Sequence, residues 1–220
     1  MASQPRPAYY PAMLDLAGRL ALLVGGGEVA AQKAGPLLEA GAELRLVAPR
    51  LVPALQARVE AGEVRWEQRA VRPGDTEGCA VVVCATDQRE VNKQVSQEAR
   101  AAGIPVNVVD DPELCTFIVP STVRRGPLQV SVSTGGRSPA FAKFMRKELE
   151  RAVGEEYGLL AEMAGRMRDL ARDAGIGYAD RDQAAAAALP ELLDLLRAGR
   201  VADAWTLAEQ RALTTPASQA

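Results

Sequence analysis

Three consecutive glycines, Gly25 to Gly27, lie between an apolar run and an alanine-rich helical pattern. Gly25 and Gly27 fit the pattern G-x-G-x-x-A, in which glycine lets the backbone approach a pyrophosphate with no Cβ in the way. The helix that follows would point free N–H groups and the positive end of its dipole at the phosphates. The motif predicts a dinucleotide site. The alternative is a tight turn that binds no ligand.

The second apolar run of this unit ends without the acidic residue that usually binds the ribose of the cofactor. It ends in Ala48-Pro49-Arg50 instead. Pro49 and Arg50 could contact the adenosine ribose through backbone groups and the guanidinium, and an arginine here can also favour a 2′-phosphate. The chemistry of these residues therefore leaves NAD and NADP open.

Polar residues follow two other apolar runs. Thr86 and Asp87 come directly after residues 79–85 (CAVVVCA), and Asp110 and Asp111 follow the next run. At the carboxyl edge of a parallel sheet such residues contact nucleotide rings and substrates, although they also serve as turn residues and helix caps. The chain has no histidine. Asp110 is therefore the best candidate for acid–base chemistry.

A second candidate anion site lies in the segment SVSTGGRSPAFAKFMRK. It combines hydroxyls, two glycines and an arginine with the start of a helix, a combination suited to carboxylates or phosphates. The candidate ligands are Ser133, Thr134, Arg137 and Ser138. Residues 120–150 carry six Lys or Arg and two Glu, a local charge of +4 in a chain of net charge −2. The alternatives are an ordinary turn and cap, and a solvated basic face.

Composition narrows the class of protein. The 220 residues suit one large domain or two small ones, and a net charge of −2 gives no global sign of nucleic acid or membrane binding. Cys79, Cys84 and Cys115 lack the spacing of a zinc or thioredoxin-like motif, so we expect no fixed metal site. The opening MASQPRP is not a signal peptide and no apolar stretch approaches about 18 residues, which favours the cytoplasm.

The first half of the chain alternates apolar runs with helical patterns. Strand-like runs, separated by helical patterns at 28–40 and 90–102, occur at residues 20–24, 44–47, 64–66, 79–85 and 106–109. This alternation predicts an α/β fold with a Rossmann-like, doubly wound parallel sheet.

After Asp110 the pattern changes. Two strand-like runs, 117–123 and 128–133, are joined by RRGP and favour an antiparallel pair. Ser138 is a natural N-cap with Pro139 at the first helical position. Helical patterns then fill the rest, and these are expected at residues 160–174, 189–197 and 201–213, before a frayed TTPASQA.

Taken together, the motifs resemble the precorrin-2 dehydrogenase/sirohydrochlorin ferrochelatase family, which also forms the N-terminal half of siroheme synthases. The resemblance runs from about Leu14 to Leu149 and rests on five ordered motifs. These are LLVGGGEVAAQKA, LLEAGAELRLVAP, CATDQREVN, VNVVDDPELCTFIVPS and VSVSTGGRSPAFAKFMRKELE. The helical last third matches in character more than in motif.

The resemblance implies NAD-dependent removal of two hydrogens from precorrin-2 to give sirohydrochlorin, followed in some members by ferrous iron insertion to give siroheme. It implies a homodimer with a nucleotide domain (1–113), a hairpin and helix dimerisation segment (114–151) and a helical domain (152–220). NAD contacts carry over to Glu28-Val29 and Pro49-Arg50, and the aspartate important for both activities carries over to Asp110.

The resemblance also gives the second anion site a partner, because precorrin-2 carries eight carboxylates. Asp110 could take a proton during oxidation, orient the macrocycle, or hold a metal transiently during insertion. A serine phosphorylated in some relatives falls at Thr134, so phosphorylation control is not expected. The 220 residues include no methyltransferase half, so we expect a separate protein to make precorrin-2.

Two other interpretations stay open. The chain could be a dehydrogenase that leaves metal insertion to a separate chelatase, since the aspartate is expected in both cases. It could also be an NAD-sensing module that signals through its helices with no chemistry, which explains the glycine loop and the helical tail. That interpretation does not explain why Asp110 accompanies a basic, hydroxyl-rich second site.

Overall fold

The computed structural model describes residues 9–214, so the opening MASQPRP and residues 215–220 of the expected frayed tail lie outside it. The chain packs as two compact units, one up to Val119 and one from Pro120 onward. Within the described residues, no helix is both long enough and apolar enough to span a membrane.

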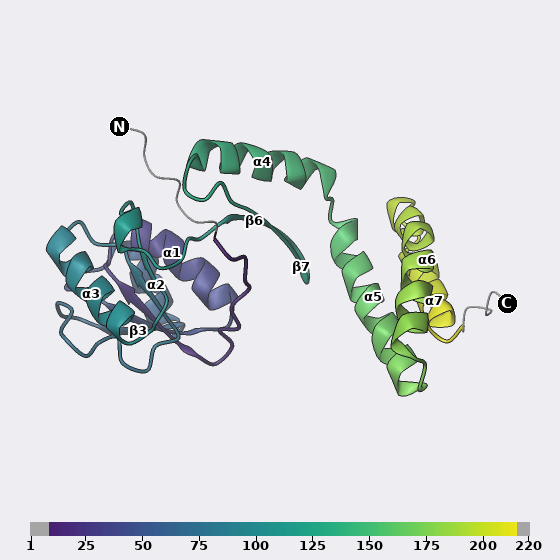
Figure 1. Ribbon diagram of the computed structural model, residues 1–220, viewed down its shortest axis with the longest axis horizontal. Coiled ribbons are helices and arrows are strands. Elements are labelled where there is room, and N and C mark those ends of the chain that lie inside the picture. Colours follow the sequence, from purple (N-terminus) through teal and green to yellow (C-terminus); the bar gives the residue numbers. More distant parts are fainter. Residues whose placement is uncertain (1–8, 215–220) are drawn as a thin grey trace. The chain divides into compact units, whose positions relative to one another are not determined.

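The first unit is built on a five-stranded parallel sheet with the order β3-β2-β1-β4-β5 (Figure 1). Its strands are β1 (Leu20–Val24), β2 (Glu43–Val47), β3 (Val64–Glu67), β4 (Val81–Cys84) and β5 (Val106–Val108). The order reverses between β1 and β4, where loops after these two strands diverge and ligands bind in such sheets. The doubly wound parallel sheet predicted from the sequence is confirmed.

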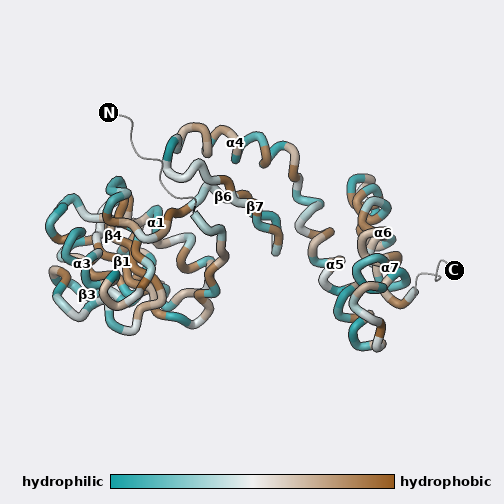
Figure 2. The backbone as a smooth tube through the Cα atoms, in the orientation of Figure 1, coloured by the Kyte–Doolittle hydropathy of each residue, from teal (hydrophilic) through white to brown (hydrophobic). Residues whose placement is uncertain are grey.

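Helices cover both faces of this sheet. Helices α1 (Glu28–Glu39) and α2 (Pro53–Glu60) pack on one face, and α3 (Arg89–Ala101) packs on the other. The central strands are apolar on both faces, and Figure 2 shows them as the hydrophobic part of this unit. This double burial explains why CAVVVCA is continuously apolar instead of alternating.

The connection from β3 to β4 has no helix and is fixed by charged groups. The guanidinium of Arg69 donates to both carboxylate oxygens of Asp75 at 2.7 Å and also pairs with Glu67. The Arg69 side chain holds the pKa of Asp75 below its usual value. Thr76 donates to Glu98 of α3 at 2.6 Å, so the loop is tied to the helix beside it.

The second unit joins a hairpin to four helices. Strands β6 (Ser121–Arg125) and β7 (Leu128–Val132) are antiparallel, as predicted. The helices that follow are α4 (Pro139–Ala152), α5 (Glu156–Asp173), α6 (Tyr178–Arg197) and α7 (Val201–Ala212). The last three form a bundle whose core includes Met163, Met167 and Leu192.

Arg125 joins the hairpin to the neighbouring helices. Its Nε donates to the carbonyl of Val153 at 3.0 Å and its Nη2 donates to the carbonyl of Glu150 at 3.2 Å, both at the end of α4. Gly158 of α5 lies so close that a Cβ there would be 2.9 Å from the carbonyl oxygen of Arg125. The hairpin, α4 and the start of α5 therefore pack as one piece.

Three details of the sequence prediction are wrong. Helix α2 was not expected, and its sequence is only weakly amphipathic, with one fully buried side chain, Leu55. The strand expected from Phe117 begins only at Ser121, because Phe117 packs against the core of the first unit. Helix α6 begins at Tyr178 and runs through Pro190, since the alanines before that proline favour helix. The division into 1–113, 114–151 and 152–220 stays a prediction.

Candidate functional site

The glycine loop between β1 and α1 contains two kinds of glycine. A Cβ on Gly25 would lie 2.3 Å from the carbonyl oxygen of Ala85, and one on Gly26 would lie 1.9 Å from that of Arg50. Gly25 also has a φ of 120°, a backbone conformation that residues other than glycine rarely adopt. Both glycines are therefore required by the packing of neighbouring loops against them.

Gly27 differs, because neither packing nor backbone conformation requires a glycine there. Its φ is −87°, and a Cβ on it would meet no protein atom within 4 Å. Gly27 is the N-cap of α1, and no side chain caps the first turn. The absence of a side chain thus keeps open the space in front of the helix N-terminus. That space and the uncapped N–H groups fit the diphosphate of a dinucleotide.

The two residues after Gly27 are exposed as well. Glu28 and Val29 are exposed in the first turn of α1, and the Val29 side chain is 41% exposed although it is apolar. Both were predicted cofactor contacts, and the structure places them beside Gly27, where a nucleotide would reach them.

The loop after β2 lies against the glycine loop. The N–H of Val52 donates to the carbonyl of Gly26 at 2.8 Å, and the N–H of Gly25 donates to the carbonyl of Val47 at 3.1 Å. Pro49 and Arg50 are exposed in this loop, and Arg50 makes no ion pair within residues 9–214. The predicted ribose contacts are therefore at the same sheet edge as the glycines.

The loop after β4 contains Thr86 and Asp87. The Thr86 hydroxyl donates to Oδ1 of Asn92 at 2.8 Å, and Nδ2 of Asn92 donates back to the carbonyl of Thr86 at 3.0 Å. This pair shapes the turn into α3. The N-cap of α3 is Gln88 and no side chain caps its first turn, so neither Thr86 nor Asp87 is the helix cap. Asp87 is exposed. Asn92 was not predicted as part of this turn. The signal was present, because Asn92 ends the motif CATDQREVN and lies about one helical turn into α3.

The turn after β5 separates the two adjacent aspartates. Asp111 pairs with Arg89 of α3 at 3.2 Å. Asp110 is exposed, and its carboxylate has no hydrogen bond or ion pair within the described part of the chain. It is also the sole non-glycine residue from 9 to 214 with a positive φ, 60°. Aspartate adopts this left-handed backbone more readily than most residues, and the unpartnered carboxylate makes Asp110 a candidate functional position.

In the candidate anion site before α4, three hydroxyl oxygens accept hydrogen bonds from backbone N–H groups of the same turn. Ser138 accepts from the N–H of Phe141 at 3.2 Å, which confirms it as the N-cap. Thr134 accepts from the N–H of Ser138 at 2.9 Å, and Ser133 accepts from the N–H of Gly135 at 3.1 Å. Arg137 differs, because its exposed guanidinium makes no hydrogen bond or ion pair within residues 9–214. Ser133 is exposed as well, and its hydroxyl keeps a proton to donate.

The buried thiols of the first unit are not poised for chemistry. Burial raises the pKa of Cys84 to about 12 and also raises the pKa of Cys79. Both thiols therefore stay protonated and act as small apolar side chains at neutral pH. Across residues 9–214, no three acidic, cysteine or histidine side chains lie close enough to hold a metal ion.

Two family models match the chain. The model described as "Putative NAD(P)-binding" covers residues 12–121, and the one described as "Sirohaem biosynthesis protein central" covers residues 125–152. The first ends near the boundary of the sheet unit, and the second spans most of the hairpin and α4.

Curated relatives agree with these models. The siroheme synthase of Pseudomonas paraeruginosa is 47% identical over 165 residues, which are 75% of this chain and 36% of that protein. The siroheme synthase of Photorhabdus laumondii is 47% identical over 161 residues, which are 73% and 34%. The chain thus spans about a third of the length of these relatives.

A solved structure is similar over nearly the whole chain. The precorrin-2 dehydrogenase SirC is 25% identical and superposes with a TM-score of 0.71, covering 92% of this chain and all of that one. The similarity therefore includes the sheet unit, the hairpin and the helices.

Proposed function

Because the chain belongs to the NAD(P)-binding family of sirohaem-biosynthesis proteins that its sequence resembles, we propose that it oxidises precorrin-2 to sirohydrochlorin with NAD as cofactor. The name of the similar structure, a precorrin-2 dehydrogenase, supports this substrate. The siroheme synthases among its relatives support the same pathway.

The oxidation removes two hydrogens from precorrin-2, one as a hydride from a ring carbon and one as a proton. Bound NAD+ supplies the hydride acceptor. The protein must therefore hold the dinucleotide at the sheet edge and provide a group that takes or relays the proton. Gly27 and the uncapped first turn of α1 would hold the diphosphate, and Pro49 and Arg50 would lie beside the adenosine ribose.

Asp110 is the residue that we assign to the proton. It follows β5, at the same edge as the glycine loop, and its carboxylate is exposed and unpartnered within residues 9–214. Asp111 cannot serve as readily, because Arg89 already holds it. The carboxylate of Asp110 can accept the proton itself or orient the macrocycle by accepting pyrrole N–H groups. This unpartnered carboxylate is the observation on which the proposal depends.

The basic segment of the second unit is proposed to bind the carboxylates of the tetrapyrrole. Arg137 precedes α4 and is exposed, and the helix N-terminus beside it favours negative charge. Ser133, Thr134 and Ser138 shape this turn through their hydroxyls. The Arg137 guanidinium and the hydroxyl protons of Ser133 and Ser138 would contact the substrate carboxylates, while Thr134 holds the turn.

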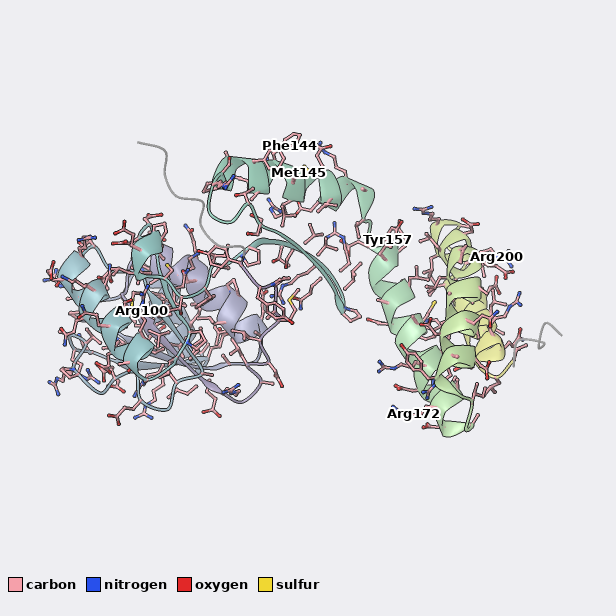
Figure 3. The ribbon with its side chains drawn as sticks, viewed as in Figure 1. Arg100, Phe144, Met145, Tyr157, Arg172 and Arg200 are labelled. Atoms are coloured by element: carbon pink, nitrogen blue, oxygen red, sulfur yellow. The ribbon has the colours of Figure 1, made fainter. Side chains whose placement is uncertain are left out.

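The hairpin and α4 are proposed to join two copies of the chain in a cytoplasmic homodimer. Phe141 and Phe144 are both exposed on α4, with ring centroids 6.3 Å apart, and Figure 3 shows Phe144 beside Met145 on this helix. Exposed aromatic pairs are typical of surfaces that a partner covers. Residues 114–151 would then be the dimerisation segment, between a nucleotide domain (1–113) and a helical domain (152–220).

Turnover by Asp110→Asn tests the proposal, with Asp111→Asn as the matched control. The amide keeps the size of the side chain but accepts no proton, so we expect NADH formation from precorrin-2 to fall at least about 100-fold. The affinity for NAD+, measured by calorimetry, should stay within about twofold. Asp111→Asn should retain turnover within about fivefold, since it loses only an ion pair with an exposed arginine. Turnover by Asp110→Asn close to that of the wild type would contradict the assignment.

Metal insertion is a second candidate activity, favoured by the same unpartnered carboxylate. Inserting ferrous iron requires loss of pyrrole N–H protons, which Asp110 could accept while the ion passes to the macrocycle. An anaerobic assay with sirohydrochlorin and ferrous or cobaltous ion measures this directly. Loss of insertion in Asp110→Asn would support a shared site. No insertion by the wild type would leave a dehydrogenase only. NAD+ binding with no NADH formed from precorrin-2 would favour a sensing module.

A further inference from the structure

Strand β5 is at the edge of the sheet, and its outward backbone groups are bonded to the chain that returns past it. The N–H of Val106 donates to Oγ1 of Thr116 at 2.8 Å, and the N–H of Thr116 donates back to the carbonyl of Val106 at 2.8 Å. The next outward N–H, that of Val108, donates to Sγ of Cys115 at 3.1 Å. Two side chains and one backbone N–H thus take the place of a neighbouring strand.

The Cys115 thiol contacts the chain on both sides of Asp110. Besides accepting from Val108 N–H, Sγ lies 3.2 Å from the carbonyl oxygen of Val108 and 3.3 Å from that of Asp111. The single S–H proton can donate to either carbonyl. The residue before and the residue after the turn at Asp110 are therefore tied to one sulfur atom.

The segment that carries Cys115 is itself anchored to α3. Ser96 donates to the carbonyl of Leu114 at 2.6 Å. Arg100, labelled on α3 in Figure 3, donates to the carbonyls of Glu113 and Cys115 at 2.6 and 3.2 Å. These bonds anchor the segment to α3, in addition to the bond that the N–H of Leu114 donates to the carbonyl of Asp111 at 3.1 Å.

We propose that Cys115 is a positioning residue for Asp110, whose thiol holds the left-handed turn that presents the carboxylate at the sheet edge. The left-handed backbone of Asp110 costs about 1–2 kcal/mol, so surrounding contacts must stabilise it. The thiol contacts both flanks of the turn, which are otherwise joined by a long backbone bond from the N–H of Asp111 to the carbonyl of Val108 at 3.4 Å. The inference rests on the catalytic role proposed for Asp110.

Cys115→Ala tests this inference, and Cys84→Ala is its matched control. Both thiols belong to the same apolar cluster of the first unit, so each substitution removes a sulfur from one core region. The Cys84 thiol makes no hydrogen bond within residues 9–214. Its backbone carbonyl, which accepts from Val109 N–H at 2.9 Å, is kept in the variant. Cys115→Ser keeps a group that can donate and accept a hydrogen bond, but its oxygen lies closer to the backbone than the sulfur does.

The first readout is amide hydrogen exchange by NMR in the cofactor-free protein. The Val108 N–H loses its acceptor in Cys115→Ala. After correction for any change in global stability, we expect this amide to exchange at least about tenfold faster than in the wild type. Cys84→Ala should leave this amide within about twofold, and Cys115→Ser should fall between the two. Equal exchange at Val108 in Cys115→Ala and Cys84→Ala would overturn the inference.

The second readout is a double-mutant cycle on turnover. Cys115→Ala should lower kcat about tenfold with the KM for NAD+ unchanged, and should lower it no further in the Asp110→Asn background. Equal losses in both backgrounds would show that Cys115 acts on something other than Asp110. Near-normal turnover by Asp110→Asn alone would instead refute the proposed function. The exchange measurement would still report whether the thiol holds the turn.

Discussion

The turn after β5 and the turn before α4 contain similar polar residues but differ in what those residues do. Before α4, the side chains of Ser133, Thr134 and Ser138 accept hydrogen bonds from the backbone of their own turn. After β5, the fold supplies the hydrogen bonds from elsewhere and leaves Asp110 unpartnered within residues 9–214. A polar side chain is left wholly free for a ligand only when other groups stabilise its turn.

The glycine loop shows the same contrast between a residue that the fold requires and a residue that is open to a ligand, and we expect the largest effects there. Gly26→Ala would place a Cβ 1.9 Å from the Arg50 carbonyl oxygen, so we expect a loss of at least about 3 kcal/mol in the free energy of unfolding. Gly27→Ala meets no protein atom within 4 Å, so its stability should change by less than about 1 kcal/mol. Its Kd for NAD+ should rise at least about tenfold, since the methyl group fills the space left for the phosphates.

Urea unfolding and calorimetric titration with NAD+ separate the two effects. Unchanged NAD+ affinity in Gly27→Ala would mean that this space holds no phosphate, and the fit of the site to a dinucleotide would be lost.

Asp75 gives the opposite extreme to Asp110, because Arg69 uses both of its carboxylate oxygens. Asp75→Asn should destabilise the protein by about 2 kcal/mol at pH 7. The Arg69 bond lowers the folded-state pKa of Asp75 below the usual 3.8. Its stabilising contribution is therefore complete above that usual value and lost as pH falls through the folded-state pKa.

Unfolding by urea from pH 7 down to pH 3 checks this prediction. The gap in stability between wild type and Asp75→Asn should narrow below about pH 4. A gap that stays constant over this range would show that the carboxylate charge does not contribute.

The smallest effects should separate cap from ligand within the turn before α4. Ser138→Ala removes the acceptor for Phe141 N–H and should cost about 1 kcal/mol of stability. Arg137→Ala should leave stability within about 0.5 kcal/mol but raise the KM for precorrin-2 about three- to tenfold. Thermal unfolding and steady-state kinetics measure the two. A normal KM in Arg137→Ala would remove this arginine from the substrate site.

Much of the fold was predictable because its signals are local. The continuous apolar run at β4, the glycines before α1 and the Ser138-Pro139 start of α4 each carry their structural reason in a few residues. Helix α2 was missed because one buried residue, Leu55, gives almost no periodic pattern. The strand expected at Phe117 was wrong because that ring packs into the core of the sheet unit, which no local pattern shows.

In the candidate site, too, some features were predictable from the sequence and others were not. The sequence by itself determined the residue types at the sheet edge, since strand ends and glycine spacing are local properties. Only the tertiary structure decided which are available: Gly27 but not Gly26 opens onto a ligand space, and Asp110 but not Asp111 keeps an unpartnered carboxylate. The physical reason is that hydrogen-bond partners such as Arg89 and Cys115 come from distant parts of the chain, so folding alone determines which polar groups they satisfy.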